Sequence, residues 1–189
     1  MTKNFLPVLL AAFVLTGCSG GPTDFTKEYH KALSSRPGIS LSPQAAREAV
    51  GGFAGLYGDL SVPNVTANAR KVYAPEAWFN DTIATEVGID AIEKYLIKTA
   101  EGAELVSAKI NDVAVSGSDC YVRWTMEIRT KNLAGGQPVI TEGVSQLRFD
   151  NEGRIVLHQD FWNPATGIYQ HLPLLGPAIR FVNGLIVGN

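Results

Sequence analysis

This sequence contains few cysteines and histidines, and its net charge is small. The 189 residues include two cysteines, Cys18 and Cys120, and three histidines, His30, His158 and His171, and the formal net charge is −2. Two cysteines do not make a disulfide framework, and the histidines show none of the paired spacings of a metal site. Because the chain also has no basic run, we expect neither a bound metal nor a nucleic-acid partner.

Motifs for cofactors and for a membrane-spanning tail are missing as well. The stretch "GGQP" at 135–138 precedes no predicted helix, so it indicates a hairpin turn and not a phosphate loop. The chain has no Gly-x-Ser-x-Gly elbow either. We therefore expect no cofactor. The apolar C-terminal tail is interrupted by Pro173, Gly176 and Pro177, which excludes a spanning helix there.

The N-terminal stretch "MTKNFLPVLLAAFVLTGC" has the features of a secretory signal. A lysine precedes a short apolar run from Phe5 to Leu15, and small residues follow. The ending "LTGC" (15–18) resembles the lipobox of bacterial lipoproteins. This resemblance implies a lipid anchor on Cys18 that attaches the protein to the bacterial cell envelope, and Ser19 after it implies the outer membrane. The alternative is a plain cleaved signal in which Cys18 occurs by chance.

These observations divide the chain into three parts. We predict a signal peptide at 1–17, a lipidated N-terminus with a tether at 18–41, and one domain with an apolar tail at 42–189. If Cys18 carries lipid, Cys120 has no partner within the chain, and we expect it to be a small apolar packing residue at the start of a strand.

Helical patterns dominate the first half of the chain. Ser42 can cap a helix whose first turn contains Pro43 and which ends near Gly58. The aromatic-rich stretch "YAPEAWFNDT" at 73–82 has no clear period, and we expect it to be irregular. Apolar residues at helical spacing predict helices at 42–58, 63–72 and 88–101, with a small amphipathic helix within 24–42.

From residue 103 onward the apolar period changes from 3.6 to 2, which indicates strands. The connections between them, such as "SGSD" and "DNEG", are short, and this favours an antiparallel meander. The sequence therefore predicts an α+β domain, in which a curved antiparallel sheet is wrapped on N-terminal helices and leaves a cone with an open mouth. The predicted strands are 103–115, 120–131, 138–149 and 154–162, with one more short helix after Pro177.

Three stretches resemble the nuclear transport factor two-like superfamily, in particular its SnoaL-like and ketosteroid-isomerase-like members. They are "VYAPEAWFND" (72–81), "GIDAIEKYL" (88–96) and "FDNEGRIVLHQDFWN" (149–163). The resemblance covers about 42–163 and implies a cone-shaped barrel. This fold hosts isomerases, cyclases, hydrolases, dehydratases and binding modules, so the resemblance implies a fold much more specifically than a function.

Asp81 is at the position where ketosteroid-isomerase-like enzymes have an aspartate base. Apolar walls could raise its pKa toward the working range of a base. Two other interpretations stay open, because Asp81 could simply line the pocket or cap the turn that follows it. The tyrosine donor of the isomerases has no counterpart, because Gly51 is at the matching place and Tyr57 is more than a turn away. This departure argues against steroid isomerase chemistry.

His158, Asp160 and Trp162 are two positions apart and share one face of the last strand with Val156. The resemblance implies that this face lines the cone. His158 could then bind Asp160 or Asp81 and move protons. The alternative is a structural polar pair on a half-exposed strand.

Trp124 shares its face with Met126, and we expect this face to pack on the helices. Glu127 shares the other face with Arg123 and Arg129, which indicates a solvated, salt-bridged surface.

Three hypotheses for function follow. The first is a lipid-anchored envelope protein whose cone binds a small apolar or amphipathic molecule. The second is an acid–base enzyme of isomerase, cyclase or hydrolase type that uses Asp81, Asp160 and His158 as catalytic residues. The third is an interaction module without an active pocket. For the apolar C-terminal tail, three roles stay open: a lid over the cone, a homodimer contact or a segment that lies on the membrane surface. The predicted ligand-binding residues are Tyr57, Tyr73, Trp78, Trp124 and Trp162.

Overall fold

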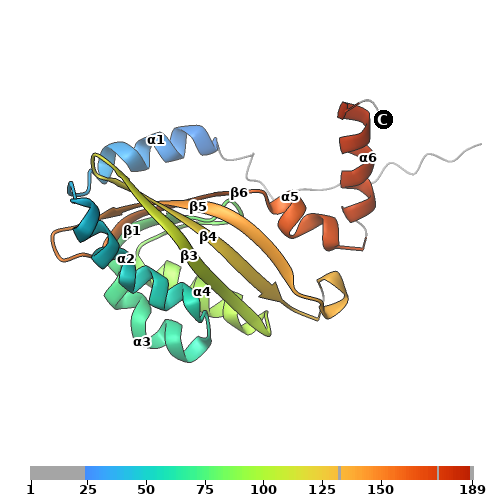
Figure 1. Ribbon diagram of the computed structural model, residues 1–189, viewed down its shortest axis with the longest axis horizontal. Helices are drawn as coiled ribbons and strands as arrows, with labels where there is room; N and C mark the ends of the chain where they lie inside the picture. The colour runs from blue at the N-terminus through green and yellow to red at the C-terminus, as the bar shows by residue number, and fades with distance from the viewer. Residues whose placement is uncertain (1–23, 132, 174, 188–189) are drawn as a thin grey trace, which may run out of the picture.

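A strongly curved six-stranded sheet dominates the computed structural model, which describes residues 24–131, 133–173 and 175–187 (Figure 1). The strand order is β2-β1-β6-β5-β4-β3, and β3 to β6 form an antiparallel meander. The predicted α+β class is confirmed, and the sheet is open, with edges at β2 and β3. The strands are β1 (Tyr73–Asn80), β2 (Thr85–Val87), β3 (Leu105–Ser116), β4 (Asp119–Arg129), β5 (Val139–Phe149) and β6 (Ile155–Trp162).

The segment 73–82 is not irregular as predicted, because most of it is strand β1. This strand runs parallel to β6 and antiparallel to β2. Its register with β6 shifts between Tyr73 and Trp78, and Pro75 lies within this interval. The shift disturbs the alternation of buried and exposed residues, and so the period-2 pattern of a strand is missing from the sequence.

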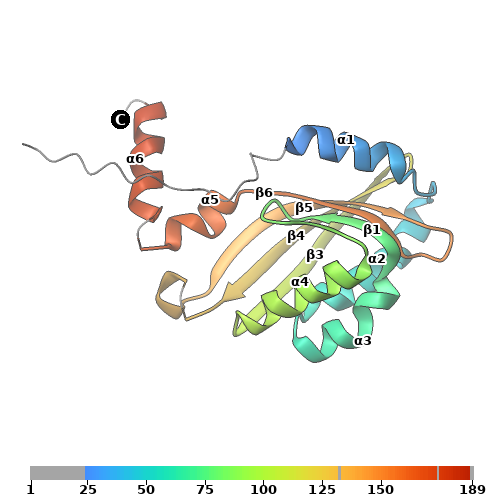
Figure 2. The ribbon, with the colours of Figure 1, turned by 180° about the vertical axis from the view of Figure 1, so that it is seen from behind.

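Three helices cover the inner face of the sheet. They are α2 (Pro43–Gly58), α3 (Val62–Val72) and α4 (Ile89–Glu101), in agreement with the prediction (Figure 2). The Ser42 hydroxyl caps α2 by accepting a hydrogen bond from the Ala45 N–H at 3.2 Å. Buried side chains from these helices pack with the sheet into one core, including Phe53, Leu56, Val65, Ile92 and Leu96.

Helix α1 (Phe25–Ser35) lies on the outer face of the sheet, opposite α2 to α4 (Figures 1 and 2). Its Ala32 packs against Trp78 and Leu157 in a second small cluster. The Arg148 guanidinium binds the main-chain oxygen of Leu33 at 2.7 Å, which ties the end of the helix to β5. Part of the predicted tether 18–41 is therefore packed on the sheet.

The C-terminal part after β6 is helical. It contains α5 (Pro164–Gly167), a short 3₁₀ helix (Tyr169–His171) and α6 (Leu175–Val187), which projects away from the sheet (Figure 1). The predicted last helix thus begins before Pro177. Phe181, Leu185 and Ile186 on α6 are exposed. No helix in the described part of the chain combines the length and the apolar character needed to cross a membrane.

Candidate functional site

Strand β6 carries the polar centre of the inner face. His158 and Asp160 point inward, while Leu157 packs outward against α1. A register shift in the pairing with β5 places Ile155 in the inner core as well, although strict alternation predicts it on the outer face. The face that bears His158 and Asp160 is therefore the one that points into the cone.

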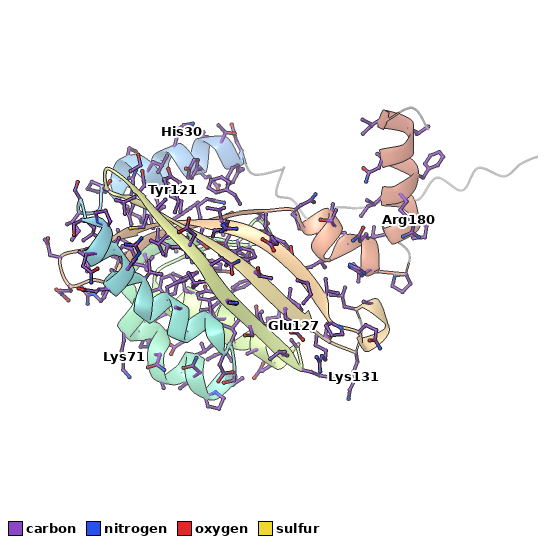
Figure 3. All side chains as sticks on the ribbon, viewed as in Figure 1. His30, Lys71, Tyr121, Glu127, Lys131 and Arg180 are labelled. Carbon is purple, nitrogen blue, oxygen red and sulfur yellow. The ribbon has the colours of Figure 1, made fainter. Side chains whose placement is uncertain are left out.

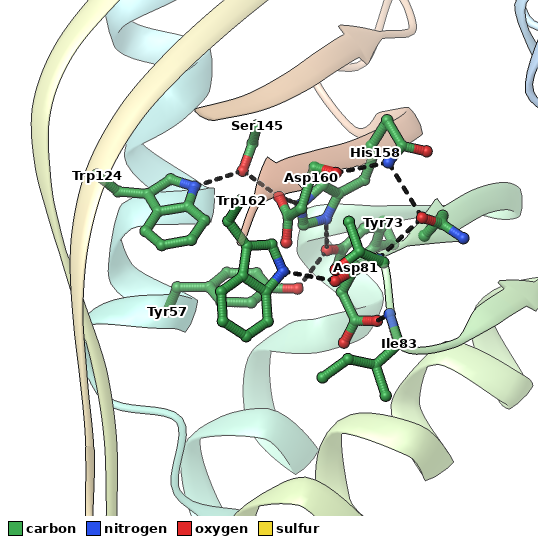
Figure 4. Close-up of polar contacts among 12 residues, drawn as sticks. Tyr57, Tyr73, Asp81, Ile83, Trp124, Ser145, His158, Asp160 and Trp162 are labelled. Carbon is green, nitrogen blue, oxygen red and sulfur yellow. Dashed lines mark hydrogen bonds and ion pairs between the residues drawn. The ribbon is translucent and has the colours of Figure 1, made fainter. Parts of the chain in front are cut away.

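His158 is fully buried and has a partner on each ring nitrogen (Figure 4). Nε2 lies 2.8 Å from Asp160 Oδ1, and Nδ1 lies 2.6 Å from the Tyr73 hydroxyl. The Tyr73 hydroxyl is in turn 2.8 Å from the Tyr57 hydroxyl. The rings of Phe53 and Phe79 meet the imidazole edge to face. This enclosure fixes the imidazole in position and excludes water from it.

Asp160 is held by a second buried contact. The Ser145 hydroxyl donates to Asp160 Oδ1 at 2.5 Å, and the Trp124 indole N–H donates to the Ser145 oxygen at 2.9 Å. Since an indole nitrogen only donates, the Ser145 proton is free to point at Asp160. The other carboxylate oxygen, Oδ2, accepts no hydrogen bond from the described residues. One oxygen of Asp160 is thus fixed, and the other is available.

Gly143 on β5 makes room for this arrangement. The Trp124 ring crosses the strand directly over Gly143, and a Cβ atom at that position would overlap the ring. The glycine therefore allows the indole to lie flat and reach Ser145.

A cavity of about 360 Å³ opens beside Asp160. Asp81, Tyr57, Tyr95 and Trp162 also line it, so both aspartates face the same space. The volume lies within the range of small-molecule sites. Most of the remaining lining is apolar, including Leu60, Phe79, Leu96, Val106, Met126 and Ile128.

Asp81 closes a turn and also lines the cavity. Its Oδ1 accepts hydrogen bonds from the main-chain N–H groups of Ile83 and Ala84, at 2.9 and 2.8 Å. Its Oδ2 accepts from the Tyr95 hydroxyl at 2.5 Å, and its main-chain oxygen accepts from the Trp162 indole at 2.7 Å. Burial raises the pKa of this carboxyl above its usual value in spite of these hydrogen bonds. The turn interpretation and the pocket interpretation therefore both describe this residue.

The tyrosines behind the pocket remain protonated at neutral pH. Burial raises the pKa of both Tyr57 and Tyr73 well above the usual value, and the nearby carboxylate of Asp160 acts in the same direction. These hydroxyls are therefore available as hydrogen-bond donors.

Three of the predicted ligand-binding residues do not line this cavity. Trp78 lies on the outer face of β1 against α1, because strand alternation turns its neighbour Phe79 inward. Tyr73 and Trp124 are buried behind the wall, where they hold His158 and Ser145. Only Tyr57 and Trp162 of the predicted set reach the cavity.

The structure also places residues that the sequence reasoning did not single out. Ser145 pairs directly with Asp160 across β5 and β6, and Tyr95 binds Asp81. Ser145 could have been identified from the sequence as a polar residue on the inward face of the predicted strand 138–149. Tyr95 has the spacing of a buried helix residue, so the sequence did not predict a hydrogen bond from its hydroxyl. Glu127 lies at the surface and pairs with Arg129 at 2.9 Å, as expected (Figure 3).

In the part of the chain that the structure describes, His, Cys, Asp and Glu side chains form no cluster of three that could hold a metal ion. Cys120, at the start of β4, is a buried free cysteine. Cys18 and the predicted signal peptide lie outside the described residues.

Solved structures similar to this one share its fold at low sequence identity. TsrD from Streptomyces laurentii is 18% identical, with a TM-score of 0.56, over 72% of this chain and 100% of its own. A protein with a ketosteroid isomerase-like fold from Catenulispora acidiphila, in complex with trimethylamine, is 21% identical, with a TM-score of 0.58, over 70% and 96%. An LEH-like epoxide hydrolase from M. tuberculosis is 16% identical, with a TM-score of 0.52, over 76% and 96%.

At these identities the likeness shows the fold alone, and the neighbours include proteins described as enzymes of different reaction types. A search of curated proteins finds no match to the sequence. The model of the SnoaL-like domain family matches residues 63–158, which span β1, α4 and the first half of β6 with its histidine. Since this match covers just over half of the 189 residues, the chain belongs to the SnoaL-like domain family.

Proposed function

We propose that this protein is an acid–base enzyme that acts on a small, mainly apolar molecule, with Asp160 as the base. The observation that carries the proposal is the state of the Asp160 carboxylate. Its Oδ1 is fixed by Ser145 and His158, while its Oδ2 is left without a partner among the described residues at the wall of the cavity. A base held in this way is oriented before the substrate arrives, which is what proton transfer from carbon requires.

The cavity itself supports a small amphipathic substrate. Its lining is mainly apolar, and its polar residues include the two aspartates, Tyr57 and Tyr95. Asp81 adds a second carboxyl to the cavity wall, and burial raises the pKa of this carboxyl above its usual value. The reaction class that fits is proton abstraction from carbon, as in isomerisation or cyclisation.

A second candidate is a binding protein without chemistry. The apolar lining favours it, because burial of an apolar ligand needs no catalytic group. Mass spectrometry of molecules that copurify with the protein tests this. Ile128→Trp fills the cavity and is expected to lose any such ligand, whereas Ile140→Trp, at an exposed position on β5, retains it.

Elimination of nitrobenzisoxazole tests the base directly. In this reaction a base removes the ring C–H proton, the N–O bond breaks, and its electron pair leaves on the phenolate oxygen, so the reaction needs only a carboxylate in an apolar site. We expect Asp160→Asn to lower kcat/KM for this elimination by about 100-fold or more. Asp112→Asn, on an exposed position of β3, is the matched control and should react like the wild type. Equal rates for Asp160→Asn and the wild type would contradict the proposal.

We also propose that lipid on Cys18 attaches the protein to the bacterial envelope, at the outer membrane. The support is the signal-like stretch that ends in "LTGC" at 15–18. Labelling of growing bacteria with an alkyne analogue of palmitate should mark the wild type and not Cys18→Ala, which should also leave the membrane fraction. A Cys18→Ala protein that stays in the membrane fraction would refute the anchor.

A further inference from the structure

Helix α6 carries a concentration of exposed apolar side chains. Of the ten large apolar residues that are exposed in the described part of the chain, five lie on this helix of 13 residues. They are Leu175, Phe181, Val182, Leu185 and Ile186. A surface helix normally turns such residues toward a core or a partner. Their exposure therefore indicates a partner that covers α6.

Four of these residues form one side of the helix, which we call the apolar face of α6. It consists of Phe181, Val182, Leu185 and Ile186. Their spacing of one and four positions places them together on a helix of about 3.6 residues per turn. Arg180 and Asn183 lie on the other side. A helix that is apolar on one side and polar on the other suits a boundary between water and an apolar medium.

The proposed lipid anchor brings this helix to a membrane. Six residues along the chain lead from Cys18 to Asp24, where the described structure begins, and such a segment reaches at most about 20 Å. Helix α1 begins at the end of the molecule from which α6 projects (Figures 1 and 2). A lipid on Cys18 would therefore hold this end of the molecule close to the lipid surface.

The charge of the C-terminal segment fits the same partner. No Asp or Glu follows Asp160 in the sequence, and Arg180 is the single Lys or Arg after Arg154. No carboxylate of this segment therefore opposes the approach of α6 to anionic phospholipid headgroups, and Arg180 adds a weak attraction.

The base of α6 is fixed to a wall of the cavity. The Gly176 N–H donates to the main-chain oxygen of Leu172 at 2.9 Å. A Cβ atom at Gly176 would overlap the main chain of Gln170, so only glycine allows this close approach. Leu172 and Ile168 line the cavity. The direction of α6 is therefore coupled to this wall.

We propose that the apolar face of α6 lies in the headgroup region of a phospholipid membrane and turns the cavity wall at Ile168 and Leu172 toward the lipid. This inference rests on the proposed lipid on Cys18. The lipid attaches the protein but leaves it free to rotate, and α6 sets its orientation. Four apolar side chains on a short helix give only reversible binding by themselves, so loss of the lipid still releases the protein.

Spin labels on the two sides of α6 test this orientation. The full chain, acylated in bacteria and carrying Cys120→Ala, receives one nitroxide at Leu185→Cys or, as the matched control, at Asn183→Cys. It is placed in vesicles of phosphatidylethanolamine and phosphatidylglycerol. We expect the ratio of oxygen to nickel-chelate accessibility to be higher at 185 than at 183 by about threefold or more. A label at Lys71→Cys, on α3 and far from α6, should show the low ratio of a site in water (Figure 3).

A carboxylate on the apolar face should abolish the difference. Phe181→Glu, introduced into the chain labelled at position 185, should lower the ratio there to that of position 183, because the charged group resists transfer into lipid. Asn183→Glu places the same charge on the other side of the helix and should leave the ratio at 185 high. Both variants should stay bound to the vesicles through the lipid.

The other outcomes identify what covers the helix instead. Equal ratios at 185 and 183 in a chain that floats with the vesicles would refute the helix contact and leave the lipid anchor intact. A label at 185 that neither oxygen nor nickel reaches would show packing on the protein itself. Spectral broadening that disappears on dilution with unlabelled protein would identify a second copy, and either result overturns the proposal. A chain that does not float with the vesicles would contradict the anchor and the helix contact together.

Discussion

Two turns of this protein begin at an aspartate that accepts two main-chain hydrogen bonds, and the two carboxyls have opposite pKa shifts. Asp81 follows β1 and accepts hydrogen bonds from the N–H groups of Ile83 and Ala84. Asp150 follows β5 and accepts from those of Glu152 and Arg154, both at 2.9 Å. In each turn the side chain replaces main-chain acceptors that the chain reversal cannot supply. Local sequence therefore accounts for both turns equally well.

Their surroundings make the two carboxyls different. Asp81 faces an apolar cavity, and burial outweighs its hydrogen bonds and raises its pKa. Burial acts on Asp150 in the same direction, but its hydrogen bonds to main-chain N–H groups and to the Arg154 guanidinium, at 3.0 Å, outweigh it and lower the pKa. A turn aspartate thus becomes a candidate for chemistry only where tertiary structure buries it without a cation.

Truncation of either aspartate to alanine should cause the largest loss of stability, and the loss should be similar in the two turns. Asp150→Ala and Asp81→Ala each leave two main-chain N–H groups without their acceptor. We expect a loss of about 1–2 kcal/mol in the free energy of unfolding at pH 7 for each variant. Urea unfolding followed by circular dichroism measures it. Asp112→Ala, on an exposed strand position, is the control, and a loss confined to one turn would show that the two are not equivalent.

The sequence predicts the main elements of this fold but not all of them. The meander, the helices and the inward placement of His158 and Asp160 follow from periodicity, short turns and the family resemblance. Strand β1 does not, because its register shift hides the alternation, and the outward position of Trp78 is lost with it.

The partners of the site residues could not be predicted in the same way. Ser145 reaches Asp160 through cross-strand register, and Tyr73 reaches His158 through a parallel pairing of β1 with β6. Both depend on which strands are neighbours, and that is a property of the whole fold. A single sequence shows polar residues on a strand, but not the residue that each of them meets.

Paired substitution by asparagine should separate the two turns by the sign of their pH dependence. Asparagine keeps the acceptor oxygen and removes the charge. For Asp81, whose folded pKa is raised, ionisation disfavours the native state. Asp81→Asn should therefore gain stability relative to the wild type as pH rises from about 3.8 through the raised pKa, by on the order of 1 kcal/mol.

For Asp150 the folded pKa is lowered, so its stabilising effect is present above the unfolded value of 3.8 and disappears as pH falls through the folded pKa. Asp150→Asn should therefore be less stable than the wild type at pH 7, by about 0.5–1 kcal/mol, and equal to it in acid. Unfolding free energies measured from acid to neutral pH test both variants. Two differences of the same sign would contradict the assigned pKa directions.

The smallest effect should come from the hydroxyl of Tyr95, which donates to Asp81 Oδ2 at 2.5 Å. This hydrogen bond lowers the pKa of Asp81 and partly offsets the effect of burial. Tyr95→Phe should therefore raise the pKa of Asp81 further and leave that of Asp150 unchanged, at a cost of about 0.5–1 kcal/mol in stability. Carbon-13 NMR titration of the two carboxyl groups in one sample measures both values. A downward shift for Asp81 would mean that the cavity, and not its hydrogen bonds, favours the charged form.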